Sequence, residues 1–196
     1  MELDIQRLTS RQRYKLMSSL IAPRPIALIT TLSPGNVINA APFSMFNMLG
    51  EDPPVLMVSI NARDDSTLKD TAINIDRDGE FVVHICDEPL AQKMHRCADP
   101  LPSNSSELLH AGFTTIASHT VRPPRIAEAP VAFECKLYEK IETTSRKIFI
   151  GEIHWLHVRD GLVNAQTCNV DLEHYSPLGR VGGAYYVTTR DRFKID

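Results

Sequence analysis

The fold of this chain is most constrained by a series of short β-rich segments, each ended by turn residues or proline. Residues 25–31 are β-rich, 33–36 carry turn chemistry, and a second β-rich segment starts at residue 37, which together predict a hairpin. The apolar run at residues 55–60 predicts a buried strand. We expect further strands over residues 81–85, 131–141 and 147–158.

Only short helices are expected between these segments. Ser10 is expected to cap the first helix, and residues 88–97 are expected to form another. Ser66 or Thr67 is expected to cap a further helix, which Gly79 ends. Six or so strands joined mostly by hairpins favour a mainly β fold with short helices, a closed or nearly closed antiparallel, Greek-key-like β-barrel, over a doubly wound parallel sheet.

The chain is expected to form one domain. Its 196 residues are 43% apolar, which is enough for a sizeable single core. The sequence shows no internal repeat, no low-complexity tract and no linker rich in Pro, Gly or Ser, so we assign residues 1–196 to a single domain. Several prolines interrupt residues 99–130, and this stretch is expected to be either functional or a covering element.

Charge and cysteine content exclude several classes of function. A net charge of -3, from 21 basic and 24 acidic residues, gives no field that would attract nucleic acid. No apolar run approaches the roughly 20 residues of a membrane helix, so we expect no membrane partner and a soluble, cytoplasmic protein. The four cysteines form no Cys-x-x-Cys pair, so we expect reduced thiols and no metal site.

The segment from Asn61 to Thr71 is a candidate phosphate site, because it leads from a buried strand into the expected first turn of a helix. Free backbone N–H groups there, the hydroxyls of Ser66 and Thr67 and the cations Arg63 and Lys69 can together hold a dianion. Ordinary helix capping by Ser66, with Lys69 in solvent, explains the same residues and stays open as the alternative.

Residues 39–44, Asn-Ala-Ala-Pro-Phe-Ser, are a candidate site for a flat ring. Pro42 cannot donate to a β ladder, so a strand that breaks here leaves neighbouring backbone groups free to pair with a ring edge. Small side chains such as Ala41 allow close approach, and Asn39 and Ser44 add polar groups. A proline bulge that turns a barrel corner accounts for the same pattern.

Four sequence blocks, in this order, resemble those of the flavin reductase-like family of FMN-binding split barrels. They are Pro-Arg-Pro at 23–25, Asn-Ala-Ala-Pro-Phe-Ser at 39–44, Lys-Asp-Thr-Ala-Ile-Asn-Ile at 69–75 followed by Phe-Val-Val at 81–83, and Phe-Ile-Gly-Glu-Ile at 149–153. The similarity covers about residues 18–160, which would form the core of the domain. It implies a homodimer that binds FMN without a covalent bond, with the ring near 39–44 and the phosphate near 63–71.

The C-terminal tail, residues 161–196, is expected to pack over this site or at a dimer interface. Residues 174–186 resemble the ending of the flavoredoxin-like branch of the family, and they supply glycines, Arg180 and tyrosines that can contact a ring or an anion. The residues expected to bind the cofactor are Arg24, Asn39, Ala41, Pro42, Phe43, Ser44, Asn61, Arg63, Ser66, Thr67, Lys69, Thr71 and Arg180.

The resemblance implies an FMN-binding oxidoreductase of the NAD(P)H:flavin reductase type. No side chain is expected to act as the catalytic acid or base, because the chemistry belongs to the flavin. Many reductases of the family carry Asp-His-x-x-Phe before the Gly-Glu block, whereas this chain has Ser-Arg-Lys-Ile-Phe at 145–149. Arg146 or Lys147 would then attract NAD(P)H, the possible cosubstrate. The alternatives are a flavoredoxin-type electron carrier or flavin-holding protein, and a structural dimer without flavin.

Overall fold

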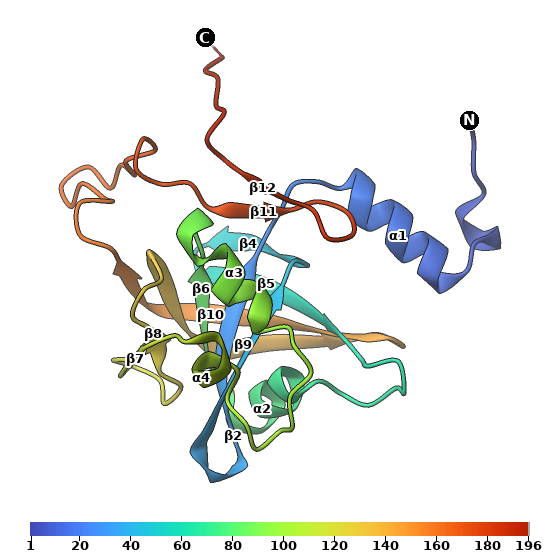
Figure 1. Cartoon of the computed structure of the whole chain (residues 1–196), viewed down its shortest axis with the longest axis horizontal. Helices are drawn as coiled ribbons and strands as arrows, with labels where there is room; N and C mark the ends of the chain where they lie inside the picture. Colours follow the sequence, from blue (N-terminus) through green and yellow to red (C-terminus); the bar gives the residue numbers. More distant parts are fainter. Residues whose placement is uncertain (196) are drawn as a thin grey trace.

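The computed structural model describes residues 1–195, and its largest element is a seven-stranded sheet (Figure 1). The strands lie in the order β3-β2-β6-β9-β10-β5-β4, and each neighbouring pair is antiparallel. Their bounds are β2 (Ala27–Ser33), β3 (Val37–Phe43), β4 (Phe46–Glu51), β5 (Pro54–Asn61), β6 (Glu80–Ile85), β9 (Val131–Glu142) and β10 (Arg146–Val158). The expected mainly β, antiparallel architecture is confirmed, and β4 is a strand that the sequence patterns did not reveal.

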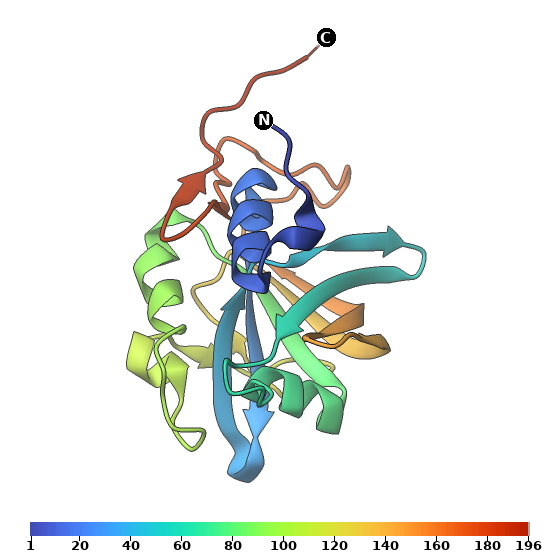
Figure 2. The same cartoon turned by 90° about the vertical axis from the view of Figure 1, so that its right-hand side faces the viewer.

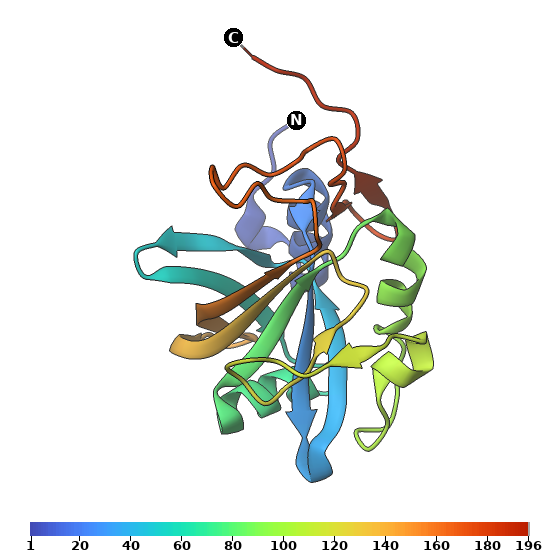
Figure 3. The same ribbon diagram turned by 90° about the vertical axis from the view of Figure 1, so that its left-hand side faces the viewer.

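The seven-stranded sheet curls so that its two edges approach each other at one end. Edge strands β3 and β4 are separated in sequence only by Ser44 and Met45, which allows at most about 11 Å between the Cα atoms of Phe43 and Phe46. Further along, β4 and β5 extend outward as a two-stranded arm (Figures 2 and 3). Within residues 1–195, β3 pairs only with β2 and β4 only with β5, so hydrogen bonds do not close the sheet into the expected barrel.

Four short α-helices accompany the sheet within residues 1–195. They are α1 (Ser10–Leu20), α2 (Asp70–Asp78), α3 (Ala91–Arg96), which follows the 3-10 turn η3 (Glu88–Leu90), and α4 (Glu107–Ala111). The cap of α1 is Thr9 rather than the expected Ser10, because Thr9 and Gln12 form a reciprocal capping box. In the described part of the chain, no helix is long and apolar enough to cross a membrane.

The sheet is covered on both faces at β2, which is buried along its whole length. Ala27 and Ile29 point into the curl of the sheet, where they pack with residues of α2, while Leu28 points to the opposite face beneath α3 and α4. Apolar and β-branched residues fill most of this buried strand, which explains why the segment was recognisable in the sequence, and its buried hydroxyl groups at residues 30, 31 and 33 are hydrogen-bonded.

The C-terminal tail returns to the beginning of the first hairpin. Strands β1 (Arg24–Pro25), β11 (Leu178–Arg180) and β12 (Tyr186–Thr188) form a separate three-stranded sheet in the order β1-β11-β12. Figure 1 shows the β11–β12 hairpin above α3, with α1 projecting to one side. The proline-rich stretch at 99–130 contains α4 and the small pair β7 (Thr115–Ile116) and β8 (Arg125–Ile126), and it covers one face of the large sheet.

Candidate functional site

A pocket of about 420 Å³ lies between α1, α3, the end of β3 and the β11–β12 hairpin. We call it the tail pocket. Its volume falls within the range of roughly 300–1,000 Å³ that is usual for small-molecule sites. Its lining includes five of the residues that the sequence predicted for cofactor binding: Arg24, Pro42, Phe43, Ser44 and Arg180.

The pairing of β1 with β11 places Arg24 directly opposite Arg180. The Arg24 guanidinium is buried and donates hydrogen bonds to the carbonyl oxygens of Ser18, Ile21 and Val181, which fastens the end of α1 and the tail to β1. Its Nε is also buried and has no hydrogen-bond partner among residues 1–195. Burial and then the neighbouring Arg180 lower the Arg24 pKa, while Tyr14 acts in the opposite direction.

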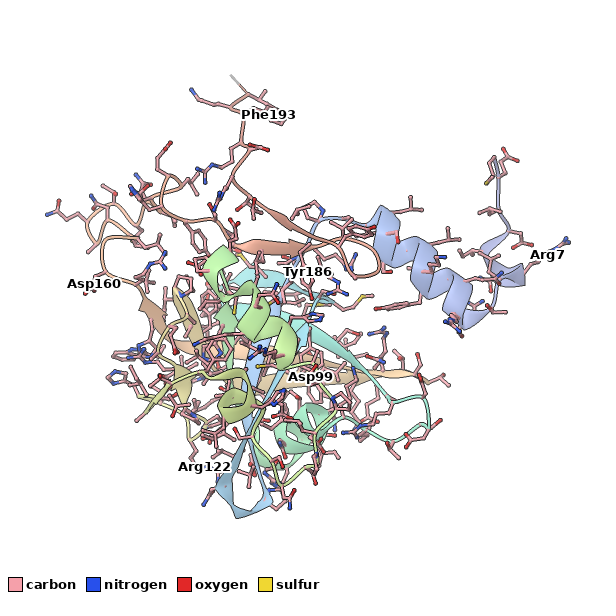
Figure 4. The ribbon with its side chains drawn as sticks, in the orientation of Figure 1. Arg7, Asp99, Arg122, Asp160, Tyr186 and Phe193 are labelled. Carbon is pink, nitrogen blue, oxygen red and sulfur yellow. The ribbon has the colours of Figure 1, made fainter. Side chains whose placement is uncertain are left out.

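Aromatic side chains form part of the wall of the tail pocket. The Arg180 guanidinium carbon lies 4.3 Å from the centroid of the Tyr186 ring, which is a cation–π contact. The Tyr186 side chain lies toward α3 (Figure 4), where its hydroxyl is 3.1 Å from Nδ1 of His95. Tyr14 from α1 and Phe43 from β3 also line the pocket.

The sequence predicted that the strand breaks at Pro42, but β3 continues to Phe43 in register with β2. The reason is that β3 is an edge strand, where a missing N–H costs no ladder hydrogen bond. The ladder ends at Ser44 and Met45, and Ser44 lines the tail pocket. We call residues 42–44 the β3 corner.

Three cations, Arg63, Lys69 and Arg146, form a basic cluster beside the β3 corner. The Lys69 ammonium nitrogen lies 5.6 Å from the centroid of the Phe43 ring, and no carboxylate within residues 1–195 forms a salt bridge with it. Burial, followed by the charges of Arg146 and Arg63, lowers the Lys69 pKa, and Asp64 raises it in part. A half-buried ammonium group that is influenced by two neighbouring guanidinium charges is a favourable place for an anion.

The other two members of the basic cluster have polar contacts of their own. Arg146, the first residue of β10, lies opposite Asn61 and donates a hydrogen bond of 3.3 Å to the Ser59 carbonyl oxygen. Arg63 donates to Asp70 Oδ2 at 2.7 Å and to the Leu68 carbonyl oxygen. The Asn61 side chain donates to the Ala62 carbonyl oxygen at 2.8 Å.

The helix after this loop begins at Asp70, with Lys69 as its cap, so the expected start at Ser66 or Thr67 is wrong. The loop residues form hydrogen bonds with each other instead. Thr67 donates from its backbone N–H and its hydroxyl to Asp65 Oδ1, at 2.9 and 2.6 Å. Ser66 has a φ of 68°, which no helical residue adopts. An anion would therefore meet loop groups and the basic cluster here, and not helix N–H groups of residues 66 and 67.

Asn39 and Thr71 lie in a buried polar network instead of the tail pocket. Asn39 Nδ2 donates to the hydroxyl oxygens of Thr31 and Thr71, both at 3.0 Å, and Asn74 Nδ2 donates to Thr31 at 2.9 Å. Asn39 is 5% exposed and Thr71 is 1% exposed, so these groups fasten α2 to the first hairpin. Ala41 packs against the core inside the curled sheet. None of the three lines the tail pocket.

Sequence reasoning did not select Tyr14, Ser18 and His95, which also line the tail pocket. Tyr14 and Ser18 are four residues apart on α1 and therefore share one helix face, which was the available signal. No local pattern marks His95, because only the tail that folds back over α3 gives it a partner. In the described part of the chain, no three metal-ligating side chains come together.

Known proteins resemble this chain over most of its length. Residues 17–186 match the model of the flavin reductase like domain. 2-Nitrobenzoate 2-nitroreductase NbaA of Pseudomonas fluorescens is 36% identical, with a TM-score of 0.91 over 100% of this chain and 95% of its own. Nitrilotriacetate monooxygenase component B of Bacillus cereus is 31% identical, with a TM-score of 0.94 and coverages of 100% and 98%. Flavoredoxin of Desulfovibrio vulgaris, at 20% identity, shares the fold, with a TM-score of 0.78 and coverages of 100% and 97%.

Proposed function

Because the chain belongs to the flavin reductase-like family, we propose that it is an FMN-binding oxidoreductase that moves electrons through a non-covalently bound FMN. The observation that carries the proposal is the contact between Lys69 and Phe43, which joins the basic cluster to the β3 corner. A dianion and a flat ring of one ligand can therefore be held side by side. Two similar proteins of more than 30% identity are named as a nitroreductase and a monooxygenase component, which supports a redox role.

The residues present fit the two ends of FMN. Lys69 and Arg63 would hold the phosphate by charge-assisted hydrogen bonds, and the Ser66 and Thr67 hydroxyls lie in the same exposed loop as Arg63. Ser44, where the β ladder stops, would offer polar groups to the ring edge, and Pro42 and Phe43 would support the ring face. The chemistry that FMN supplies when bound is transfer of electrons through its ring. The chain orients the ring and limits the access of water.

NAD(P)H is the cosubstrate that we propose, with Arg146 as the residue that attracts its negative charge. Lys147, the other residue considered for this role, already pairs with Asp76 and with Glu142, so its charge is compensated. Since position 146 carries arginine where many family members have histidine, a flavoredoxin-type carrier that takes electrons from a protein donor is the second candidate. Anaerobic mixing of the FMN-loaded protein with NADH and NADPH distinguishes the two: rapid bleaching supports the reductase, and no bleaching supports the carrier.

We further propose that residues 1–196 form one split-barrel domain that works as a homodimer. The curled sheet leaves β3 and β4 unpaired on their outer sides within the described residues, and such edges need cover. Helix α1 projects from the body with Met17, Leu20 and Ile21 at least half exposed, and Met48 and Leu49 are exposed on the β4–β5 arm. Such apolar surface is typical of subunit contacts. Light scattering that finds a monomer would reject the dimer.

The direct test of the proposed function is FMN uptake. Purified protein freed of any ligand is titrated with FMN while the quenching of flavin fluorescence is followed. Saturable binding in the micromolar range or tighter, with a visible flavin spectrum that stays with the protein on gel filtration, is the expected result. Protein that takes up no FMN would overturn the proposal.

A further inference from the structure

A carboxylate from α4 occupies the outer edge of strand β3. Glu107, the first residue of α4, accepts a hydrogen bond of 2.9 Å from the Ala40 backbone N–H through Oε2, and the residue is only 9% exposed. Because the backbone groups of alternate residues in a strand point to the same side, the nitrogen of Pro42 also faces this edge. The carboxylate therefore lies on the same edge as the β3 corner, about 7 Å before Pro42 along the strand.

The charge of Glu107 is not matched by a cation. No salt bridge joins it to a Lys, Arg or His side chain within residues 1–195, and two basic side chains of α4 and α3 have other partners, His110 with Asp99 and Lys93 with Glu128. Protection of a strand edge explains the hydrogen bond to Ala40. A neutral glutamine would accept the same hydrogen bond without the cost of burying a charge. The ionisable group therefore requires an explanation of its own.

The groups that face Glu107 come from α2, α3, α4 and β3. Burial raises the pKa of Glu107, whereas the N–H groups of Ala40 and of Glu107 itself lower it. Asp70, the first residue of α2, raises this pKa as well, and His110 on α4 lowers it. Cys97, which follows α3, donates to the Glu107 carbonyl oxygen at 3.9 Å, and burial raises the Cys97 pKa to about 12, so the thiol stays neutral. A further negative charge nearby would raise the Glu107 pKa and favour uptake of a proton.

Packed apolar side chains lie between Glu107 and the candidate flavin site. Ala40 and Leu108 belong to the same buried core cluster as Ile26 and Met94, and the last two residues line the tail pocket. Charges separated by the protein interior are screened less than charges in water. A negative charge that forms on a ring at the β3 corner therefore acts on the Glu107 carboxylate.

We propose that Glu107 takes up a proton when the bound flavin is reduced. The inference rests on the proposed function, which places the flavin ring at the β3 corner. Two electrons and one proton convert FMN to its reduced anion, with the proton on N5 of the ring, and add one negative charge. A second proton, from solvent, converts the Glu107 carboxylate to the carboxylic acid and offsets that charge. Glu107 acts on the equilibrium of reduction through its charge, so it is not a catalytic residue.

Anaerobic redox titration of the FMN-loaded protein with dithionite, at several pH values between about 5 and 8.5, tests the proposal. Glu107→Gln is the variant, because an amide keeps the acceptor for the Ala40 N–H and removes the charge. Glu128→Gln is the matched control, since Glu128 also accepts a backbone N–H, from Thr114 at 3.0 Å, and does not line the tail pocket. Infrared difference spectra of the parent protein, reduced minus oxidised, detect a new carboxylic acid without any substitution.

At about pH 8, reduction of the flavin in Glu107→Gln is expected to be at least fivefold more favourable than in the parent, or about 20 mV for a two-electron couple. The difference narrows as the pH falls, because protonation makes Glu107 neutral in both redox states. Reduction of the parent adds a carboxylic acid band that Glu107→Gln lacks, and Glu128→Gln behaves like the parent. A difference in potential that does not change with pH, or a parent without the band, would overturn this inference alone. A parent that binds no FMN contradicts the proposed function, and the inference with it.

Discussion

The ammonium nitrogen of Lys69 lies 5.6 Å from the centre of the Phe43 ring, which couples the loop before α2 to the end of β3. The two segments come from separate parts of the chain, and α2 and β3 are held together by the Asn39–Thr71 hydrogen bond. These two contacts join the basic cluster and α2 to strand β3. A ligand that spans them meets a preorganised site, which lowers the entropic cost of binding.

Replacing Lys69 with alanine is expected to weaken FMN binding by tenfold or more. Loss of a charge-assisted hydrogen bond costs about 1.5–3 kcal/mol, and about 1.4 kcal/mol corresponds to a factor of ten in affinity. Fluorescence titration measures the change. Lys69→Arg keeps the charge and is expected to retain most of the affinity, while Lys136→Ala, at an exposed position of β9, serves as the control. Unchanged affinity in Lys69→Ala would exclude this residue as a phosphate ligand.

Asn39→Ala is expected to destabilise the protein by about 1–3 kcal/mol, because it removes the donor to the buried Thr71 hydroxyl and one of the two donors to the Thr31 hydroxyl. Its effect on FMN affinity should be smaller than that of Lys69→Ala, since Asn39 does not line the tail pocket. Urea unfolding followed by circular dichroism gives the first quantity. A variant with parental stability and lost FMN binding would instead return Asn39 to the flavin site.

Gly151→Ala is expected to lower the free energy of unfolding by about 1–3 kcal/mol. A Cβ atom at this position would overlap the ring of Phe81 and lie 3.2 Å from the Cβ of Cys135, in the packed interior of the curled sheet. Gly50→Ala is the matched control, because its added Cβ would lie 3.4 Å from the nearest atom, a Val55 methyl group. Equal stabilities of the two variants would contradict the packing described for Gly151.

Acidification is expected to destabilise the protein in a window set by His84. This imidazole is fully buried, and burial lowers its pKa from 6.5 to about 4, with a contribution from Arg125 and with the Leu28 carbonyl oxygen acting in the opposite direction. The folded state holds His84 neutral while the unfolded chain takes up a proton below pH 6.5. Stability is therefore full above that pH and is lost as the pH falls toward 4, by about 3 kcal/mol in total.

The control for this window is His84→Gln, which does not titrate. Urea unfolding at pH values of about 7.5, 5.5 and 4.5 should show a smaller loss for the variant than for the parent protein. Glu134 acts at lower pH. Burial alone would raise its pKa, but hydrogen bonds from His157, His119 and Thr120 outweigh burial and lower the pKa to about 2. The stability that ionised Glu134 contributes is therefore lost only below pH 4.5, the usual pKa of this side chain. Identical pH profiles of variant and parent would contradict the role of His84.

The strands β2, β5 and β6 were predictable because most of their positions are buried, and buried strand positions favour apolar and β-branched residues. Strand β4 was not, since its side chains are largely exposed on the projecting arm and follow no clear alternation. The start of α2 was misplaced because Ser66 and Thr67 are good caps in isolation. Only the loop contacts with Asp65, and the positive φ of Ser66, show that the helix starts later.

The candidate site was predictable where its residues belong to local sequence patterns, and not where it depends on contacts between distant parts of the chain. Residues 42–44 and residues 63–69 were each selected by the turn and charge chemistry of their own segment. The opposition of Arg24 and Arg180 depends on a tail strand that pairs with β1 across most of the chain length, and no local pattern reports it. Asn39 and Thr71 were selected as polar residues near a predicted ligand, but their side chains bind each other, which only three-dimensional placement reveals.

The central claim is that the β3 corner and the basic cluster together bind FMN. Titration of ligand-free protein with FMN, in parallel for the parent chain, Lys69→Ala and Lys136→Ala, tests it most directly. The account predicts saturable binding by the parent and by Lys136→Ala, with affinity at least tenfold weaker in Lys69→Ala. A parent protein that leaves flavin fluorescence unquenched, or equal affinities in all three proteins, would contradict it.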